Sequence, residues 1–201
     1  MPALKRFVRG LAGPLARGLV ALGVSANALT LVGFLLNCLA GATAAAGLLP
    51  LAGALYLLFS SLDFLDGAVA RLTGSAGPFG AFFDSVLDRG AEAAVLVGLS
   101  YWYAANQQPL LVALCGIALS GSFLVSYARA RAEGLGLECE VGWLQRPERI
   151  VLTGVGLLLA NLHPLVLPTV LGALALVTAI TTYQRIRHVG QLTAAARDGA
   201  G

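Results

Sequence analysis

The chain has 201 residues, of which 58% are hydrophobic and only 11% are charged, and its mean hydropathy is +0.82. A soluble domain usually carries about 25% charged residues, so this composition excludes one and indicates an integral membrane protein. The formal net charge of +3 gives no reason to expect a nucleic-acid partner. The length allows about six spans of roughly 20 residues, joined by short loops, in a single membrane domain of residues 1–201.

The first segment, residues 1–18, places four basic residues among Leu, Phe and Val at helical spacing. This pattern is typical of an amphipathic helix that lies on an anionic leaflet. The segment lacks the compact apolar core and cleavage site of a secretory signal peptide. We therefore predict an N-terminal amphipathic juxtamembrane helix, broken near Pro14, ahead of the first span.

Six apolar segments follow, separated by polar or Gly- and Pro-containing connections. They cover about residues 27–47, 51–72, 79–105, 110–127, 150–162 and 165–183. The fifth is short for a full crossing, so we expect its helix to reach back into the segment Arg-Pro-Glu-Arg. This predicts an all-α bundle of six transmembrane helices over residues 27–188, followed by a polar tail, residues 189–201.

The distribution of basic residues predicts the orientation of this bundle. The 13 Lys and Arg residues fall in the N-terminal segment, near the link between spans two and three, between spans four and five, and in the C-terminal tail. The other three turns contain none. Six crossings place these two sets of connections on opposite faces. The positive-inside rule then puts both termini on the cytoplasmic side of the cell membrane.

Four of the ten acidic residues lie close together within apolar flanks. Asp63 and Asp66 are three residues apart near the end of the second predicted span. At this spacing both side chains lie on one face of a helix. Asp84 and Asp88 are four apart near the start of the third span and share a face likewise. The two pairs should meet across the intervening turn, at the cytoplasmic face of the membrane.

Four carboxylates in apolar surroundings repel one another strongly unless cations keep them ionised. The ligands are all oxygen, which suits Mg²⁺ or Mn²⁺ better than zinc. Gly67 and Ala70 share the face of the first pair, Gly80 shares that of the second, and Arg71 adds a positive charge. Carboxylates, cations, small residues and one Arg together can cradle a pyrophosphate.

The spacing D-x-x-D-G-x-x-A-R, eight residues, then G-x-x-x-D-x-x-x-D resembles the signature of the CDP-alcohol phosphatidyltransferases. The matching residues are Asp63, Asp66, Gly67, Ala70, Arg71, Gly80, Asp84 and Asp88. The resemblance implies an enzyme of phospholipid synthesis, in which an alcohol attacks the phosphorus next to the diacylglycerol of a CDP-lipid and releases CMP. It also implies two Mg²⁺ ions, or Mn²⁺, held by the four Asp residues, with Asp88 as the general base.

The resemblance further implies residues that bind the CDP-lipid. They are Asn27, Thr30, Gly67, Arg71 and Gly77. Asn27 begins an Asn-x-x-Thr element, although Ala26 stands where the family usually has Pro, and Gly77 stands where it commonly has Ser or Thr. For Asn27 the alternative is a helix cap, a role that Ser25 can also fill.

A second resemblance concerns the acceptor. The segment SYARARAEGLGLECEVGWLQRPERIVL resembles that of the phosphatidylinositol phosphate and archaetidylinositol phosphate synthase group of the family. It implies that Arg129, Arg149 and Arg185 bind the phosphate of an acceptor such as inositol 1-phosphate, with glycerol 3-phosphate as the second choice. Arg129 replaces the Lys of that group. The alternative is that these arginines anchor helix ends to anionic lipid headgroups.

Three further questions stay open. The segment GFLLNCLAGATAAAG has small residues four apart, which allow close helix packing within the chain or in the homodimer that the family resemblance implies. Glu92, one turn from Asp88, either extends the site or, as we favour, pairs with a neighbouring Arg or polar group. A divalent-cation transporter is the alternative function, but its carboxylates would be expected at mid-membrane depth on several helices.

Overall fold

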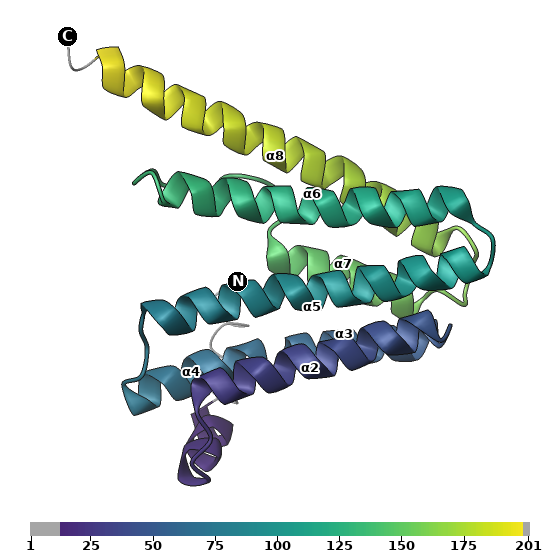
Figure 1. Ribbon diagram of the computed structural model, residues 1–201, viewed down its shortest axis with the longest axis horizontal. Coiled ribbons are helices and arrows are strands. Elements are labelled where there is room, and N and C mark those ends of the chain that lie inside the picture. Colours follow the sequence, from purple (N-terminus) through teal and green to yellow (C-terminus); the bar gives the residue numbers. More distant parts are fainter. Residues whose placement is uncertain (1–12, 199–201) are drawn as a thin grey trace.

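The computed structural model describes residues 13–198, with side chains described through residue 194, and it is helical from end to end (Figure 1). A helical stretch at residues 13–21 precedes seven labelled helices. These are α2 (Ala26–Ala45), α3 (Leu49–Ser60), α4 (Asp63–Thr73), α5 (Pro78–Ala105), α6 (Pro109–Glu133), α7 (Arg146–Leu158) and α8 (Val166–Asp198). Much of the predicted amphipathic segment, residues 1–12, lies outside the described residues.

Four segments are long and apolar enough to cross a membrane, which confirms the prediction of an all-α membrane protein. They are Ala26–Ala45, Leu49–Thr73, Pro109–Glu133 and Val166–Ala194. Helix α5 has the length, at 28 residues, but it carries four charged side chains between residues 84 and 92. Helix α7 has only 13 residues. These two helices therefore do not meet the same test of length and apolarity.

Three boundaries differ from the predicted spans, the third being the end of α8, which continues to Asp198 through most of the predicted polar tail, residues 189–201. The second span is interrupted at Ser61 and Leu62, so that Asp63 opens α4 instead of continuing α3. Helix α6 runs on through the segment Ala-Arg-Ala-Arg-Ala-Glu, which the sequence analysis assigned to a connection. Ala, Arg and Glu are strong helix formers, and an ion pair of Arg129 with Glu133, four residues apart, supports this extension.

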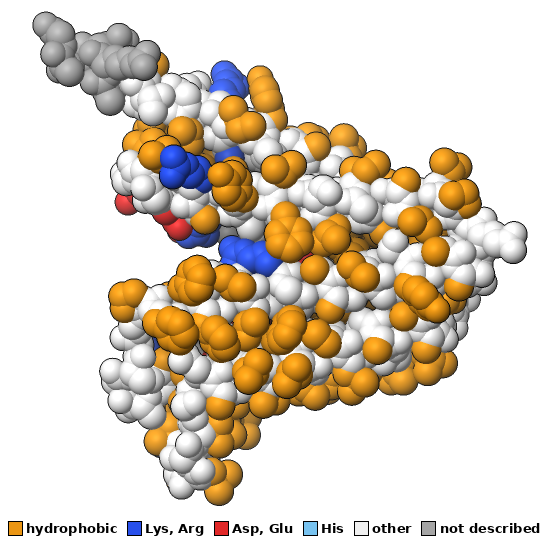
Figure 2. All heavy atoms as spheres, viewed as in Figure 1, with side chains coloured by type: hydrophobic (Ala, Val, Ile, Leu, Met, Phe, Trp, Pro, Cys, Tyr) orange, Lys and Arg blue, Asp and Glu red, His pale blue; other side chains and the backbone are white. Residues whose placement is uncertain are grey.

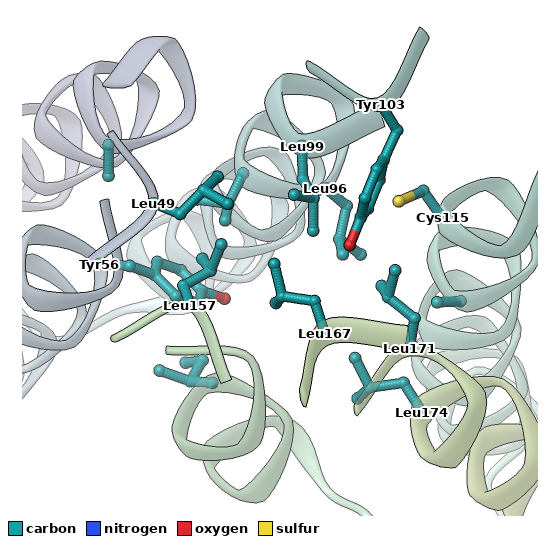
Figure 3. Close-up of a cluster of buried hydrophobic side chains, with 14 residues drawn as sticks. Leu49, Tyr56, Leu96, Leu99, Tyr103, Cys115, Leu157, Leu167, Leu171 and Leu174 are labelled. Atoms are coloured by element: carbon teal, nitrogen blue, oxygen red, sulfur yellow. The ribbon is translucent and has the colours of Figure 1, made fainter. Parts of the chain in front are cut away.

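The helices pack in pairs, α2 with α5, α3 with α7, and α6 with α8, and α5 also contacts α6. Figure 3 shows the apolar core where α3, α5, α7 and α8 meet. Its largest side chains include Leu49, Tyr56, Leu96, Leu99, Tyr103, Leu157, Leu167, Leu171 and Leu174. Charged side chains gather instead toward the end of the molecule where α5 begins and α6 ends (Figure 2). The fold thus has an apolar body and one polar end.

Helices α2 and α5 make the closest backbone approach. A Cβ atom on Gly41 would lie 2.4 Å from the carbonyl oxygen of Ala94, and one on Gly98 would lie 2.0 Å from the carbonyl oxygen of Gly41. No side chain fits at either position, so glycine is required there. The small-residue row of α2 therefore packs within the chain, against α5, at the Gly41–Gly98 contact.

Candidate active site

The helix ends at the polar end of the molecule place the four aspartates. Asp63 and Asp66 lie in the first turn of α4, where the partial positive charge of the helix N-terminus favours carboxylates. The helix closes at Gly74, whose φ of +63° suits glycine. The chain then turns into α5 and presents Asp84 and Asp88 in its early turns. Helix α2 contacts both α4 and α5, so it brings the two pairs to one space.

Asp66 is held in place from both sides. The hydroxyl of Thr30, on α2, donates a hydrogen bond of 2.9 Å to Asp66 Oδ2. The backbone N–H of Gly67 donates to the other oxygen, Oδ1. Asp66 is buried, so these two bonds give each carboxylate oxygen a partner and hold the side chain in place. Thr30 is thus a residue that orients an acidic side chain as well as one that lines the site.

Asp84 supplies an oxygen that awaits a partner. Its Oδ1 atom is buried and has no hydrogen-bond partner among the residues that the structure describes. Such an oxygen is costly in apolar surroundings and is a natural ligand for a hard cation. Within residues 13–198, however, no three acidic, His or Cys side chains stand close enough to hold a metal ion as they are placed. The carboxylate oxygens are suitable ligands for such a cation, but the four side chains would have to move closer to one another to coordinate it.

Arg146 joins two of these four carboxylates. Its Nη1 atom lies 2.9 Å from Asp63 Oδ2 and 2.6 Å from Asp88 Oδ2, so one guanidinium bridges α4 and α5. The sequence analysis did not select this residue. The signal was present, because Arg146 and Arg149 are three apart in the first turn of α7 and therefore share a face. The missing information was which helices that face would meet.

Glu92 pairs with Arg149, as the sequence analysis favoured. Arg149 donates two hydrogen bonds to the Glu92 carboxylate, Nε to Oε1 at 2.7 Å and Nη2 to Oε2 at 2.8 Å. Arg149 is only 1% exposed. A bidentate, buried pair of this kind ties the start of α7 to the middle of α5. Arg149, which the sequence assigned to the acceptor, therefore has an internal partner.

The other two arginines assigned to the acceptor also have protein partners. Arg129 forms ion pairs of 2.7 and 3.0 Å with two exposed glutamates. Arg185 is 3% exposed, and its guanidinium donates to the backbone carbonyls of Val125 and Val141. All three arginines contact the link between α6 and α7: Arg129 at Glu140, Arg185 at Val141 and Arg149 at Leu144.

A cavity of about 190 Å³ adjoins the carboxylates. It is lined from α2, α4, α5 and the link between the last two, and it includes Asn27, Thr30, Asp66, Gly67, Gly77, Gly80 and Asp84. Four of the five residues predicted to bind the CDP-lipid therefore line one space. The fifth, Arg71, lies at its edge, with Nη1 3.4 Å from the position of a Cβ on Gly67.

The helix-cap question at α2 is answered by Ser25. Its hydroxyl oxygen accepts a hydrogen bond of 3.2 Å from the backbone N–H of Ala28, and Ser25 is the N-cap residue. Asn27 is therefore free of that role. Its Oδ1 atom faces α5, 3.6 Å from where a Cβ on Gly80 would lie. The Asn side chain is available to a molecule in the cavity.

Comparison with known proteins agrees with this geometry. The CDP-alcohol phosphatidyltransferase family matches residues 23–183, and the chain belongs to this family. It is 38% identical over 191 residues to the archaetidylinositol phosphate synthase of Methanothermobacter thermautotrophicus, covering 94% of this chain and 92% of that protein. It is also 38% identical over 205 residues to the phosphatidylinositol phosphate synthase of Mycobacterium tuberculosis, covering 94% of this chain and 90% of that protein.

Solved structures show the same similarity in three dimensions. The crystal structure of the M. tuberculosis phosphatidylinositol phosphate synthase with CDP-DAG bound matches with a TM-score of 0.85 at 32% identity, covering 89% of this chain and 92% of that one. The structure of the same enzyme in complex with manganese and citrate matches with a TM-score of 0.84, covering 89% of this chain and 88% of that one. The chain is thus an all-α, membrane-embedded transferase of this family.

Proposed function

We propose that the protein transfers the phosphatidyl group of CDP-diacylglycerol, or of an archaeal ether-lipid counterpart, to a hydroxyl of inositol 1-phosphate. The products are phosphatidylinositol phosphate, or its ether-lipid equivalent, and CMP. The observation that carries this proposal is the cavity between α2, α4 and α5, in which Asn27 and Gly77 share one space with Asp66 and Asp84. A nucleotide placed there has its pyrophosphate beside the carboxylates.

The four aspartates are the proposed ligands of two divalent cations, Mg²⁺ or Mn²⁺. Their all-oxygen donor set and the unpartnered Oδ1 of Asp84 support this assignment. When bound, such cations neutralise the pyrophosphate and the charge that develops on the departing CMP. Thr30 keeps Asp66 turned toward this place, and Arg71 is positioned at the cavity edge for a phosphate oxygen.

Asp88 is the proposed general base. It takes the proton of the acceptor hydroxyl as that oxygen forms its bond to the phosphorus next to diacylglycerol, while the bond from this phosphorus to CMP breaks. Asp88 is mostly buried, with 12% of its side chain exposed, so bulk water does not compete strongly for it. The proton would come from a hydroxyl delivered between α5 and the start of α7.

The acceptor phosphate is proposed to bind among Arg129, Arg149 and Arg185. Their positive charge, and the contact that each makes with the link between α6 and α7, support a phosphomonoester rather than a neutral alcohol. Each also has a protein partner, so the phosphate would share these arginines with a carboxylate or a carbonyl oxygen. Arg129 is the most accessible of the three and the easiest to redirect, with 37% of its side chain exposed.

We further propose six crossings, with α5 and α7 as the third and fifth, and a homodimer in the cell membrane. The alternation of basic and charge-free connections supports this count and places both termini and the site on the cytoplasmic side. The charges of α5 face neighbouring helices at the polar end, where Arg149 and Arg146 pair with them, which lowers the cost of embedding this helix.

The test is CMP release by the purified protein in detergent with CDP-diacylglycerol and Mg²⁺ or Mn²⁺. Inositol 1-phosphate, glycerol 3-phosphate, inositol and serine are offered separately as acceptors. We expect release with inositol 1-phosphate, much less with glycerol 3-phosphate, and none when EDTA is present. Release with no acceptor in the panel would refute the transferase, and release with glycerol 3-phosphate alone would reassign the acceptor.

A further inference from the structure

One positive side chain lies within the acidic site itself. Arg146 Nη1 bonds to Oδ2 of Asp63 and to Oδ2 of Asp88, one carboxylate from each helix of the proposed metal site. Both carboxylates are largely covered, with 26% and 12% of their side chains exposed. Their charge is therefore poorly screened by water, and a guanidinium at hydrogen-bond distance is a strong counter-ion.

The position of Arg146 is built into the fold. One turn along α7, Arg149 is clamped by Glu92, and Glu92 itself lies one turn from Asp88 on α5. The ion pairs Arg146–Asp88 and Arg149–Glu92 therefore both join α7 to α5, about one helical turn apart. The Nε atom of Arg146 is buried and has no hydrogen-bond partner within the described part of the chain, so this side chain is incompletely satisfied where it lies.

Arg146 and a divalent cation require the same oxygens. A guanidinium is always protonated and only donates, so it cannot act as a ligand. A cation on Asp63 and Asp88 would also lie within a few ångströms of the Arg146 charge, and like charges this close repel strongly in a poorly solvated site. One guanidinium offsets only part of the charge of four carboxylates, whereas divalent cations offset more.

We propose that Arg146 is an internal counter-cation, which competes with the divalent ion for Asp63 and Asp88 and turns away from them when the ion binds. This inference rests on the metal site of the proposed function. Arg146 keeps α4 and α5 together while the site awaits its ion, and it sets the affinity of the site for the ion. Its role is one of positioning and competition and requires no contact with the lipid.

The test measures Mn²⁺ binding to the full-length purified protein in detergent, without lipid or acceptor, by the loss of the free-ion electron paramagnetic resonance signal. Arg146→Gln removes the charge and is expected to tighten Mn²⁺ binding by roughly tenfold, a modest part of the repulsion between charges at this separation. Arg131→Gln is the charge-matched control, since Arg131 is exposed near the end of α6, and its Mn²⁺ affinity should equal that of the unchanged protein.

Thermal unfolding gives a second measurement on the same samples. Without Mn²⁺, Arg146→Gln should unfold at a lower temperature, because the carboxylates repel one another. With saturating Mn²⁺ it should gain more in unfolding temperature than the unchanged protein does. If Arg146→Gln does not fold, Arg146→Lys decides, because Lys lacks the planar fork and should give a smaller but measurable tightening.

The possible failures are distinguishable. No Mn²⁺ binding by the unchanged protein would overturn both the metal site and the counter-cation. Equal affinities of the unchanged protein, Arg146→Gln and Arg146→Lys would overturn the counter-cation alone and leave the metal site standing. Weaker binding in Arg146→Gln would also overturn it, since Arg146 would then support the ion instead of competing with it.

Discussion

Helices α2 and α5 run side by side from the polar end of the molecule into its apolar body, and their two ends use glycine for opposite purposes. In the apolar body, Gly41 and Gly98 let the backbones touch, and a Cβ on Gly98 would lie 2.0 Å from a carbonyl oxygen. At the polar end, a Cβ on Gly80 would meet its nearest atom at 3.6 Å, and one on Gly77 at 4.0 Å. Helix packing therefore requires Gly41 and Gly98, whereas Gly77 and Gly80 leave room for the cavity.

The difference shows how a chain with 25 glycines divides them between structure and function. A glycine that faces a backbone atom at under 3 Å is explained by the fold alone. Packing does not require glycine beside open space, and at Gly77 and Gly80 that space is the cavity. This comparison predicts that changes at the two ends of the α2–α5 pair will separate activity from stability.

The largest effect should come from Asp88→Asn at the polar end. We expect CMP release to fall about 10³-fold, because the general base is lost. The unfolding temperature should change little, since the removal of one charge from an acidic cluster offsets the weakened ion pair with Arg146. CMP-release kinetics and a thermal unfolding curve on the same preparation measure both. A variant that keeps full activity would refute the general-base role of Asp88. A variant that does not fold would contradict the expectation that changes at the polar end alter activity and not stability.

Glu92→Gln tests the boundary between the two ends. It leaves the buried Arg149 without its carboxylate, which should cost about 3 kcal/mol of stability. Activity should fall as well, because α7 loses its anchor to α5. The double variant Glu92→Gln with Arg149→Gln is the control and should regain part of the loss, as no unpaired charge remains. An unchanged unfolding temperature for Glu92→Gln would show that the pair does not support the fold.

Gly98→Ala tests the apolar body. The added methyl group meets the carbonyl oxygen of Gly41, and we expect a loss of about 2 kcal/mol from overpacking. Activity per folded molecule should be little changed. Gly116→Ala on α6 is the matched control, because a Cβ there has no neighbour within 4 Å. Equal unfolding temperatures for the two variants would mean that the close α2–α5 contact is not needed.

Gly80→Ala should have the smallest effect, and it should change substrate binding and not stability. Its methyl group enters the cavity at ordinary contact distance from Asn27, and Ala favours the helix by up to about 1 kcal/mol, so stability should hold or rise. The KM for CDP-diacylglycerol should rise about fivefold, roughly 1 kcal/mol of binding. The KM for the acceptor serves as the internal control. A rise in both values would place the effect outside the nucleotide cavity.

The sequence predicts the acidic site well and its surroundings less well. Asp63, Asp66, Asp84 and Asp88 stand out because carboxylates at helical spacing are rare in apolar flanks, and that signal is local. The pairing of Glu92 was predictable for the same reason, since a lone buried acid needs a partner. Arg146 was not selected, because its position depends on where α7 packs against α4 and α5, which no local pattern specifies.

Helix limits were predictable where composition changes sharply. The start of α7 at Arg146 was expected from the shortness of the fifth apolar segment. The interruption at Ser61 and Leu62 has no marker such as Pro or Gly, so it went unpredicted. The extension of α6 was missed because charged residues were equated with a connection, although Ala, Arg and Glu all favour a helix.

The contact between Gly41 and Gly98 sets the separation of α2 and α5 far from the cavity. Each residue lies 14 positions along its helix from the cavity, counted from Asn27 and Asp84, which is about 21 Å at 1.5 Å per residue. Over this length, a change of about 3° in the angle between the helices would displace the cavity wall by about 1 Å. A contact without side chains in the apolar body therefore helps to set how precisely the two walls of the cavity face each other.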